Sequence, residues 1–437
     1  MRQKTRNTFA LTHPTDILGA LVGLKDVAVL SYIRRGPVVE LVIEQSPVNL
    51  DCPSCHKRAH IKERPLVRYV DLPVYGRPMT LGWKKHRMAC PNPHCATNSF
   101  VVGDHRIAAK GCLLTTRAAK WATQQVGQGR TVAEVAAELG CDWHTVNDAL
   151  TTYGSALIEA DRKRLSRTRA IGLDETSFVH RSGFVTEYAT TVADVANHQI
   201  IEVLPSRNYV EVARWVHDQP ASWRGGIRYG ALDMSSTYAA VYTVTLPGAT
   251  QVVDPFHVVS LANRTLDAVR RRVQSETLGH RGRKNDPLYR IRRVLLMGEE
   301  KLDAKGSDRL SSLLELGDPD GYVAIAYRVK ERLREFYRTS DPAVAQEMLA
   351  ELVAHCKKPS MPPELKRLGR SLERWFDKIC AYHLEKISNG PTESINNLIK
   401  RIKRIGFGFR NFENYRIRVL LYAGKPNWRV LGSIVVT

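Results

Sequence analysis

Two short apolar segments that each end in an aspartate constrain the fold of this chain most. Residues 170–173 (Ala-Ile-Gly-Leu) lead to Asp174, and residues 227–232 (Ile-Arg-Tyr-Gly-Ala-Leu) lead to Asp233. Across residues 169–257 such strand-like segments alternate with helical patterns, which is typical of an α/β domain. Because sites in open α/β sheets form at the carboxyl ends of the strands, both aspartates are expected at a functional edge.

A third acid, Glu393, falls in the first turn of a helix predicted to begin near residue 390, where a Gly-Pro pair stands. Helical spacing places further polar residues on the face of Glu393: Asn396, Asn397 and Lys400. Lys400 is two turns beyond Glu393 and can contact a phosphate. Side chains alternate along a strand, so Glu175 cannot face the same site as its neighbour Asp174.

Two aspartates and a glutamate that converge can hold two Mg²⁺ ions. One ion activates a water or a 3′-OH group, and the other stabilises the leaving oxygen. Oxygen ligands suit Mg²⁺, with Mn²⁺ as the alternative ion. A single aspartate at a strand end is more often a cap or turn residue. The combination of Asp174, Asp233 and Glu393 in an α/β domain therefore carries the prediction.

Two cysteine pairs predict a zinc ribbon. Cys52 and Cys55 have the two-residue separation of a metal knuckle, and Cys90 and Cys95 have a wider, four-residue separation. A hairpin predicted at residues 67–83 lies between the pairs and completes the ribbon layout. Four cysteines are the expected ligands, with His94 or His56 as alternatives. The isolated cysteines are expected in hydrophobic cores: Cys112, Cys141, Cys356 and Cys380.

The N-terminal region lacks the apolar segment and cleavage site of a secretory signal. Its most apolar stretch, residues 17–30, contains Lys25 and Asp26 and cannot span a bilayer. We therefore expect no membrane association and a reducing, cytoplasmic setting. In such a setting cysteines serve as metal ligands or buried thiols rather than as disulfides.

The formal net charge of +21 indicates a polyanionic partner, because a charge surplus of that size does not help folding. The Lys and Arg residues cluster in short runs at residues 162–164, 270–272, 281–284 and 400–404. Clusters suit a phosphate backbone better than scattered charges do, so nucleic acid is the predicted partner.

Residues 130–147 have the spacing of a helix-turn-helix. Thr131 and Glu134 form a predicted capping box, Gly140 supplies the turn, and Asp142 can cap the second helix. A recognition helix contacts base edges from its N-terminal residues, and those predicted to be exposed here are Trp143, His144, Thr145 and Asn147. The alternative is an ordinary helical hairpin, which is less consistent with a basic chain that also carries two cysteine pairs.

Together these features resemble bacterial insertion-sequence transposases of the ISL-three type, over essentially the whole chain. The segments that carry the resemblance are the cysteine pairs, the helix at 142–152, and residues 172–175, 232–235, 253–259, 388–397 and 406–412. The resemblance implies an RNase H-like domain in which Asp174, Asp233 and Glu393 are the DDE triad. Asp254 and His257 resemble a motif that follows the fifth strand in several DDE families and would support the site, with a core or helix-cap role as the alternative.

One departure concerns the residues just before Glu393. Some DDE enzymes have Tyr and Arg there, whereas this chain has Lys386 and Asn389. The resemblance also implies the domain boundaries. We expect a zinc-binding β-rich domain (1–105), a helix-turn-helix domain (106–165), a catalytic domain (166–257 and 389–437) and a helical insertion (258–388).

The expected function is that of a transposase. It would bind terminal inverted repeats, cleave the 3′ ends with the help of metal ions, and join them to target DNA. Because two ends must be held together, a homo-oligomer on double-stranded DNA is expected. One alternative is a zinc and helix-turn-helix regulator whose RNase H-like domain is inactive. Another is an RNase H-like nuclease that does not read an end sequence.

Overall fold

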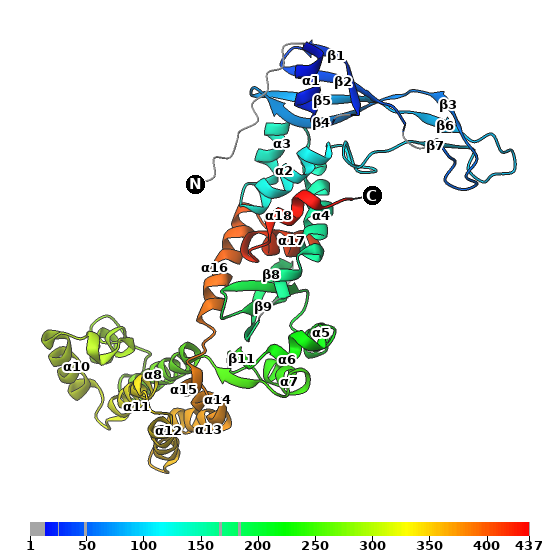
Figure 1. The fold of residues 1–437 in the computed structure, drawn as a ribbon. Coiled ribbons are helices and arrows are strands. Elements are labelled where there is room, and N and C mark those ends of the chain that lie inside the picture. Colours follow the sequence, from blue (N-terminus) through cyan, green and yellow to red (C-terminus); the bar gives the residue numbers. More distant parts are fainter. Residues whose placement is uncertain (1–13, 25, 48–49, 166–167, 182–184, 437) are drawn as a thin grey trace, which may run out of the picture. The chain divides into compact units, whose positions relative to one another are not determined.

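A computed structural model describes residues 14–24, 26–47, 50–165, 168–181 and 185–436 (Figure 1). Contacts divide the chain into two compact units. The first comprises Met1–Arg164 together with Arg401–Thr437, and the second comprises Leu165–Lys400. Among the described helices, none combines the length and apolar composition that crossing a membrane requires.

A four-stranded sheet opens the first unit. Its order is β1 (Val27–Arg35), β2 (Val38–Gln45), β5 (Arg77–Lys84) and β4 (Leu66–Val74), and α1 (Pro14–Val22) precedes it. Strands β1 and β2 form one antiparallel hairpin, and β4 and β5 form another, so the predicted hairpin at 67–83 is confirmed. The buried face carries Leu41, Tyr69, Leu81 and Trp83.

A separate three-stranded sheet lies near the cysteines. Its order is β3 (His60–Glu63), β6 (Arg87–Ala89) and β7 (Ser99–Val101). The expectation that the 67–83 hairpin belongs to the zinc ribbon is therefore wrong. Tyr69 and Trp83 bury their side chains in the core of the larger sheet, and β5 pairs with β2. The ribbon is built instead from short strands on either side of that hairpin.

The predicted helix-turn-helix is confirmed in detail. It consists of α2 (Thr116–Gly127), α3 (Val132–Leu139) and α4 (Trp143–Ala160). Thr131 and Glu134 form the capping box, and Gly140 ends α3 in the left-handed region with φ of 71°. The Asp142 side chain caps α4 by accepting a hydrogen bond from the Thr145 N–H at 2.9 Å.

The C-terminal segment packs on this helix-turn-helix. Helices α17 (Phe412–Ala423) and α18 (Trp428–Ser433) both contact α4 and α2. A Cβ atom added to Gly154 would lie 2.8 Å from Ile417 Cγ2, and one added to Gly127 would lie 2.4 Å from Trp428 Cη2. These glycines permit the close approach. Residues 401–437 therefore group with the helix-turn-helix by their contacts, and the assignment of 389–437 to the catalytic domain stays a prediction.

The second unit contains a mixed five-stranded sheet. Its order is β10 (Gln199–Leu204), β9 (Val185–Asp194), β8 (Ala170–Arg181), β11 (Tyr229–Leu232) and β12 (Thr250–Val253). Strands β8, β9 and β10 are antiparallel neighbours, while β11 runs parallel to both β8 and β12. The expected α/β character is confirmed. Strand β8 continues to Arg181, so it does not end at Asp174 as the sequence indicated.

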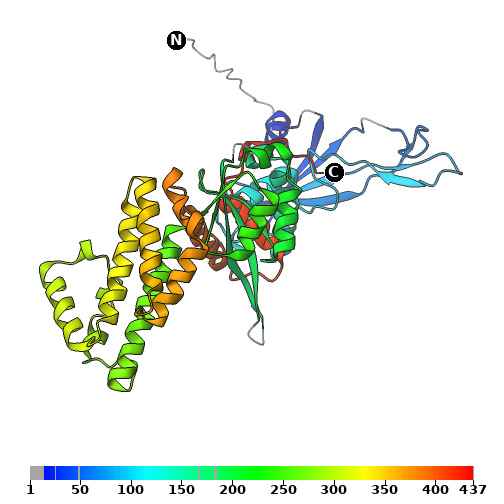
Figure 2. The same ribbon diagram turned by 90° about the horizontal axis from the view of Figure 1, so that it is seen from below.

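Helices α5 (Tyr209–His217), α6 (Ala221–Gly226) and α7 (Ser236–Thr245) accompany the sheet (Figure 2). Tyr242 of α7 is fully buried and donates a hydrogen bond to the backbone oxygen of Ala231 at 2.9 Å. The Tyr242 ring also lies where a Cβ atom on Gly230 would fall, so α7 packs directly on β11. This packing holds β11 in place beside β8.

Residues 255–385 are mostly helical, in line with the helical insertion expected at 258–388. The helices are α8 (Pro255–Leu278), α9 (Pro287–Arg290), α10 (Ala304–Gly317), α11 (Tyr322–Arg338), α12 (Pro342–Lys357), α13 (Pro363–Arg374), α14 (Phe376–Cys380) and α15 (Tyr382–Glu385). Helices α8 to α14 contribute side chains to one hydrophobic core that they share with the sheet. The helix predicted from residue 390 is confirmed as α16 (Gly390–Ile405).

Candidate active site and metal centres

The strand register places three aspartates in one row. Leu173 of β8 pairs with Leu232 of β11, and Leu232 pairs with Val253 of β12. The residue after each of these is an aspartate: Asp174, Asp233 and Asp254. Because neighbouring strands lie about 4.8 Å apart, three carboxylates are concentrated along one edge of the parallel part of the sheet.

Asp174 and Asp233 are neighbouring, half-buried carboxylates. Asn396 of α16 donates a hydrogen bond to Asp174 Oδ2 at 2.5 Å. Asp233 Oδ1 is buried and has no hydrogen-bond partner among the described residues. Burial, together with the negative charge of Asp174, raises the pKa of Asp233 to about 6, and burial also raises the pKa of Asp174. Two desolvated acids that repel each other form a site that a divalent cation would stabilise.

Glu393 lies closest to the third aspartate. Its Oε1 atom is 3.9 Å from His257 Nε2, and Asp254, His257 and Glu393 each offer a ligand atom within 4.8 Å of the others. His257 also lowers the pKa of Asp174, Asp233 and Asp254, which burial otherwise raises. The acids named from the sequence therefore share one neighbourhood, but Glu393 groups with Asp254 and His257 rather than directly with Asp174 and Asp233. Asn397 and Lys400 lie exposed on the same helix.

The start of α16 is fitted tightly against β8. Asn389 and Thr392 are fully buried, and Asn389 Oδ1 accepts a hydrogen bond from Thr392 Oγ1 at 2.5 Å. A Cβ atom on Gly172 would lie 2.4 Å from Asn389 Oδ1 and 2.7 Å from Thr392 Oγ1. Gly172 thus leaves the space that lets the first turn, with Glu393, approach the acidic edge. These contacts were not predicted from the sequence, although a glycine two residues before Asp174 was a usable signal.

The substitution Gly172→Ala is expected to destabilise the chain by about 1–3 kcal/mol, because the added methyl group overpacks a filled space. Thermal unfolding of the full chain should show a lower midpoint. Gly248→Ala is the matched control, because within the described structure nothing lies within 4 Å of its added Cβ. Equal midpoints for the two variants would contradict the close packing of α16 on β8.

The raised pKa of Asp233 predicts a pH dependence in buffer without divalent cations. Its folded pKa of about 6 exceeds the ordinary value of 3.8, so the folded state holds its proton more tightly. Asp233 therefore destabilises the fold progressively as pH rises from about 4 to 6. The Asp233→Asn variant should melt like the wild type at pH 4 and a few degrees higher at pH 7. A constant difference between the two across this range would contradict the assignment.

The N-terminal turn of α4 differs from expectation at one position. Trp143 and His144 are exposed and Asn147 is half-buried, so all three can contact DNA. Thr145 is only 7% exposed, and its Oγ1 donates a hydrogen bond to Asp142 Oδ2 at 3.2 Å. The expectation that Thr145 is exposed is therefore wrong. Its hydroxyl completes the helix cap instead of facing outward.

Four cysteines converge beside the small sheet. The Sγ atoms of Cys52 and Cys95 lie 3.7 Å apart, and those of Cys55 and Cys90 lie 3.4 Å apart. A tetrahedral site with zinc–sulfur bonds of 2.3 Å needs sulfurs about 3.8 Å apart, so the set fits a metal ion. A hydrogen bond from the backbone N–H of Lys57 lowers the pKa of Cys55 to about 6, whereas burial and the neighbouring thiols raise the pKa of Cys90 and Cys95 despite their backbone hydrogen bonds, so Cys55 ionises before them.

The two histidines considered as alternative ligands lie outside this group. The set of side chains close enough to share an ion consists of the four cysteines alone, within the described part of the chain. His94 and His56 are both exposed. Of the isolated cysteines, Cys356 is buried, whereas Cys112, Cys141 and Cys380 are half-buried.

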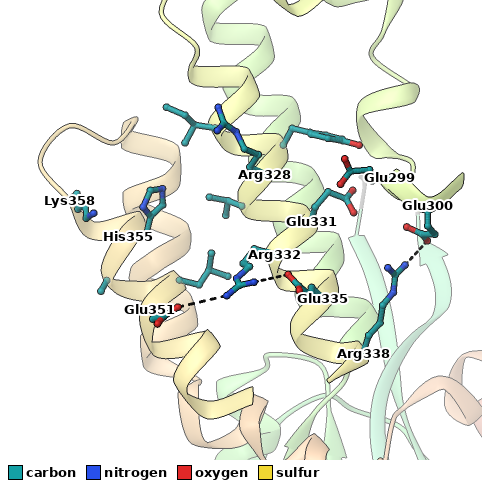
Figure 3. A pocket seen from close by; sticks show the side chains of 15 residues that line it. Glu299, Glu300, Arg328, Glu331, Arg332, Glu335, Arg338, Glu351, His355 and Lys358 are labelled. Atoms are coloured by element: carbon teal, nitrogen blue, oxygen red, sulfur yellow. Dashed lines mark hydrogen bonds and ion pairs between the residues drawn. The ribbon is translucent and has the colours of Figure 1, made fainter. Parts of the chain in front are cut away.

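A cavity of about 1200 Å³ lies among the helices, near η3 (Glu299–Lys301) and between α11 and α12 (Figure 3). Its charged groups compensate one another. Arg332 pairs with Glu335 at 2.8 Å and with Glu351 at 3.8 Å, and Arg338 pairs with Glu300 at 2.6 Å. The close acid and imidazole groups that can bind a metal ion belong to the edge of the sheet and not to this cavity.

A helix-turn-helix together with an α/β domain that concentrates carboxylates at one edge defines a DNA-processing enzyme. The chain belongs to the ISL3 family of transposases, the ISL-three type of the sequence analysis. A family model described as a transposase matches residues 171–419, and one described as the helix-turn-helix domain of transposase family ISL3 matches residues 104–154.

Two relatives illustrate the similarity. The transposase for insertion sequence element IS1001 of Bordetella parapertussis is 25% identical over 394 residues, which cover 88% of this chain and 91% of that protein. The transposase for insertion sequence element IS1557 of Mycobacterium tuberculosis is 26% identical over 289 residues, which cover 62% of this chain and 63% of that protein.

Proposed function

We propose that this transposase binds the terminal inverted repeats of an insertion sequence, cleaves the 3′ ends and joins the new 3′-OH groups to target DNA. The observation that carries the proposal is the strand register that places Asp174 beside Asp233, in the same neighbourhood as Glu393. Carboxylates converging in this way suit metal-dependent phosphodiester chemistry.

The sheet supports an RNase H-like fold for the catalytic domain. Three antiparallel strands, β10, β9 and β8, are followed in space by the parallel strands β11 and β12. Parallel connections require crossovers, and α6 and α7 lie in the chain segments that lead to β11 and β12. Because β8, β11 and β12 run in the same direction, Asp174, Asp233 and Asp254 follow the paired residues at one edge, and the crossover through α7 starts from that edge.

Each proposed residue has a role that its surroundings suggest. Asp174, Asp233 and Glu393 hold Mg²⁺ or Mn²⁺, and the bound ions supply the activation of the attacking water or 3′-OH and the stabilisation of the leaving oxygen. Asn396 fixes the orientation of Asp174 through its hydrogen bond. The exposed Lys400 is placed on the same helix to contact a phosphate.

Recognition of the end is assigned to the first unit. Trp143, His144 and Asn147 at the start of α4 are proposed to contact bases. Lys and Arg clusters elsewhere in the chain contact phosphates, which position the protein but carry no sequence information. Because two ends must be held together for joining, the working form is proposed to be a homo-oligomer on double-stranded DNA.

The test uses the full-length protein with Mg²⁺ or Mn²⁺ and labelled duplexes that carry the inverted repeat flanking the gene. A 3′-OH nick at the repeat boundary, and joining of that end to a second duplex, are the expected products. Equal cutting of a scrambled duplex would favour a nuclease that does not read an end. Specific binding without cleavage under every metal condition would favour a regulator.

A further inference from the structure

We propose that Asp254, His257 and Glu393 form a divalent cation site of their own, next to the Asp174–Asp233 pair. The proposal rests on the two-ion chemistry proposed above and names the residues that complete the second ion's ligand set. The bound ion would be a transition metal dication such as Mn²⁺ rather than Mg²⁺.

The geometry of the three side chains fits one ion. Their ligand atoms lie within 4.8 Å of one another, and His257 Nε2 is 3.9 Å from Glu393 Oε1. Metal–ligand bonds of 2.0–2.2 Å place neighbouring ligands about 3 Å apart and opposite ligands about 4.2 Å apart. The side chains of His257 and Glu393 are 32% and 42% exposed, so small rotations can bring them onto a shared ion.

Asp254 supplies the independent evidence for a ligand. It is only 2% exposed, and one carboxylate oxygen, Oδ1, accepts a hydrogen bond from the Asn389 N–H at 3.1 Å. The other oxygen, Oδ2, is buried without a hydrogen-bond partner in the part of the chain that the structure describes. A buried carboxylate oxygen left in this state is costly, and a cation beside it removes the cost.

The contacts of Asp254 with its own helix are weaker than those of an ordinary helix cap, and the Asn389 N–H acts on its carboxyl more strongly than the His257 N–H does. Asp254 stands at the N-terminal cap position of α8, but its side chain accepts no capping hydrogen bond from the described residues of that helix. Asp142 on α4 and Asp303 on α10 do accept such bonds from their own helices. The Asp254 carboxylate is instead oriented toward the start of α16, which carries Glu393.

The ligand types indicate which ions the site prefers. Asp174 and Asp233 offer oxygen ligands alone, which suit Mg²⁺. The second group adds an imidazole nitrogen, and imidazole favours transition metal ions over Mg²⁺. If the two neighbouring sites prefer different metal ions, one acidic edge can hold two ions that do not compete for the same carboxylates.

The experiment is a Mn²⁺ titration of the full-length, zinc-loaded chain without DNA, with free Mn²⁺ followed by electron paramagnetic resonance. Wild type is expected to bind two ions per chain. His257→Gln and Asp254→Asn, which nearly preserve side-chain size, should each weaken one of them at least about tenfold and leave the other unchanged. Asp174→Asn should weaken the other ion.

His217→Gln is the matched control, because His217 lies 3.6 Å from an acid, Asp218, on α5, and both side chains are largely exposed. It should bind Mn²⁺ as the wild type does. Thermal unfolding shows that each variant is folded, and Glu393→Gln gives a third, independent removal of a ligand. Unchanged Mn²⁺ stoichiometry and affinity in folded His257→Gln would overturn the proposal.

The result separates this inference from the proposed function. If the Mn²⁺ site is lost as expected but wild-type protein does not cleave a repeat end, the site stands and the proposed reaction fails. If cleavage occurs and His257→Gln binds Mn²⁺ like wild type, the reaction stands and the second site is wrong.

Discussion

Asp174→Asn, Asp233→Asn and Glu393→Gln are each expected to abolish cleavage and joining of a repeat end while leaving end binding nearly intact. Each change removes a negative charge proposed to hold an ion but keeps the side-chain size. Metal ions contribute several kcal/mol of transition-state stabilisation, and about 4 kcal/mol corresponds to a thousandfold loss of rate. Cleavage is measured on labelled ends under single-turnover conditions, and binding by gel shift with the same duplex.

Glu175→Gln is the control for these substitutions. Glu175 is adjacent to Asp174 on β8, but it is exposed and its Oε2 pairs with Arg207 at 3.1 Å. Its removal should change the cleavage rate little, whereas the neighbouring Asp174→Asn should reduce it below detection. Wild-type cleavage by a triad variant would remove that residue from the proposed triad. A loss of end binding in the same variant would show that its effect is not confined to chemistry.

Local features were predictable from the sequence because their causes lie within a few residues. The capping box of Thr131 and Glu134, the turn at Gly140 and the cap at Asp142 depend on neighbours three residues away, and all formed as predicted. The acids at the ends of apolar segments were also found. The aspartates lie side by side because Leu173, Leu232 and Val253, the residues before them, are paired across β8, β11 and β12.

Features that depend on distant contacts were not predictable in this way. The partner of the 67–83 hairpin is decided by burial of Tyr69 and Trp83 against β2, not by the cysteines on either side. The C-terminal helices pack on α4 because Gly154 leaves space for Ile417, more than 250 residues later in the chain. The grouping of Glu393 with Asp254 and His257 likewise requires α16 to be placed by the buried Asn389.

Replacing Cys52 and Cys55 by Ser is expected to release one zinc ion per chain and to unfold the β3–β6–β7 sheet. The strands of that sheet have three or four residues each, and the fully buried apolar side chains near it are few, with Met88 the largest. Metal binding supplies on the order of 10 kcal/mol in small zinc sites, which such a core cannot replace. Elemental analysis of the wild type and the variant measures the zinc.

The same substitution should leave the four-stranded sheet folded, which is the sharper part of this prediction. Strands β4 and β5 lie between the cysteine pairs in sequence, but Tyr69, Leu81 and Trp83 are buried in a core shared with β2. Hydrogen exchange should therefore lose protection at residues 60–63 and 87–101 and keep it at residues 66–84. Cys112→Ser is the control, because this half-buried cysteine lies outside the four-cysteine group and should retain both zinc and protection.

Two outcomes would contradict the assignment in different ways. A wild-type protein without zinc would show that the four converging thiols do not form a zinc site, despite sulfur separations of 3.4 and 3.7 Å. Loss of protection across residues 66–84 would show that the two sheets fold as one cooperative unit. Because β3 and β6 flank the β4–β5 hairpin in sequence, separate unfolding requires the larger sheet to hold that hairpin without help from the metal. The pairing of β5 with β2 and the burial of Trp83 in the core of that sheet supply the contacts.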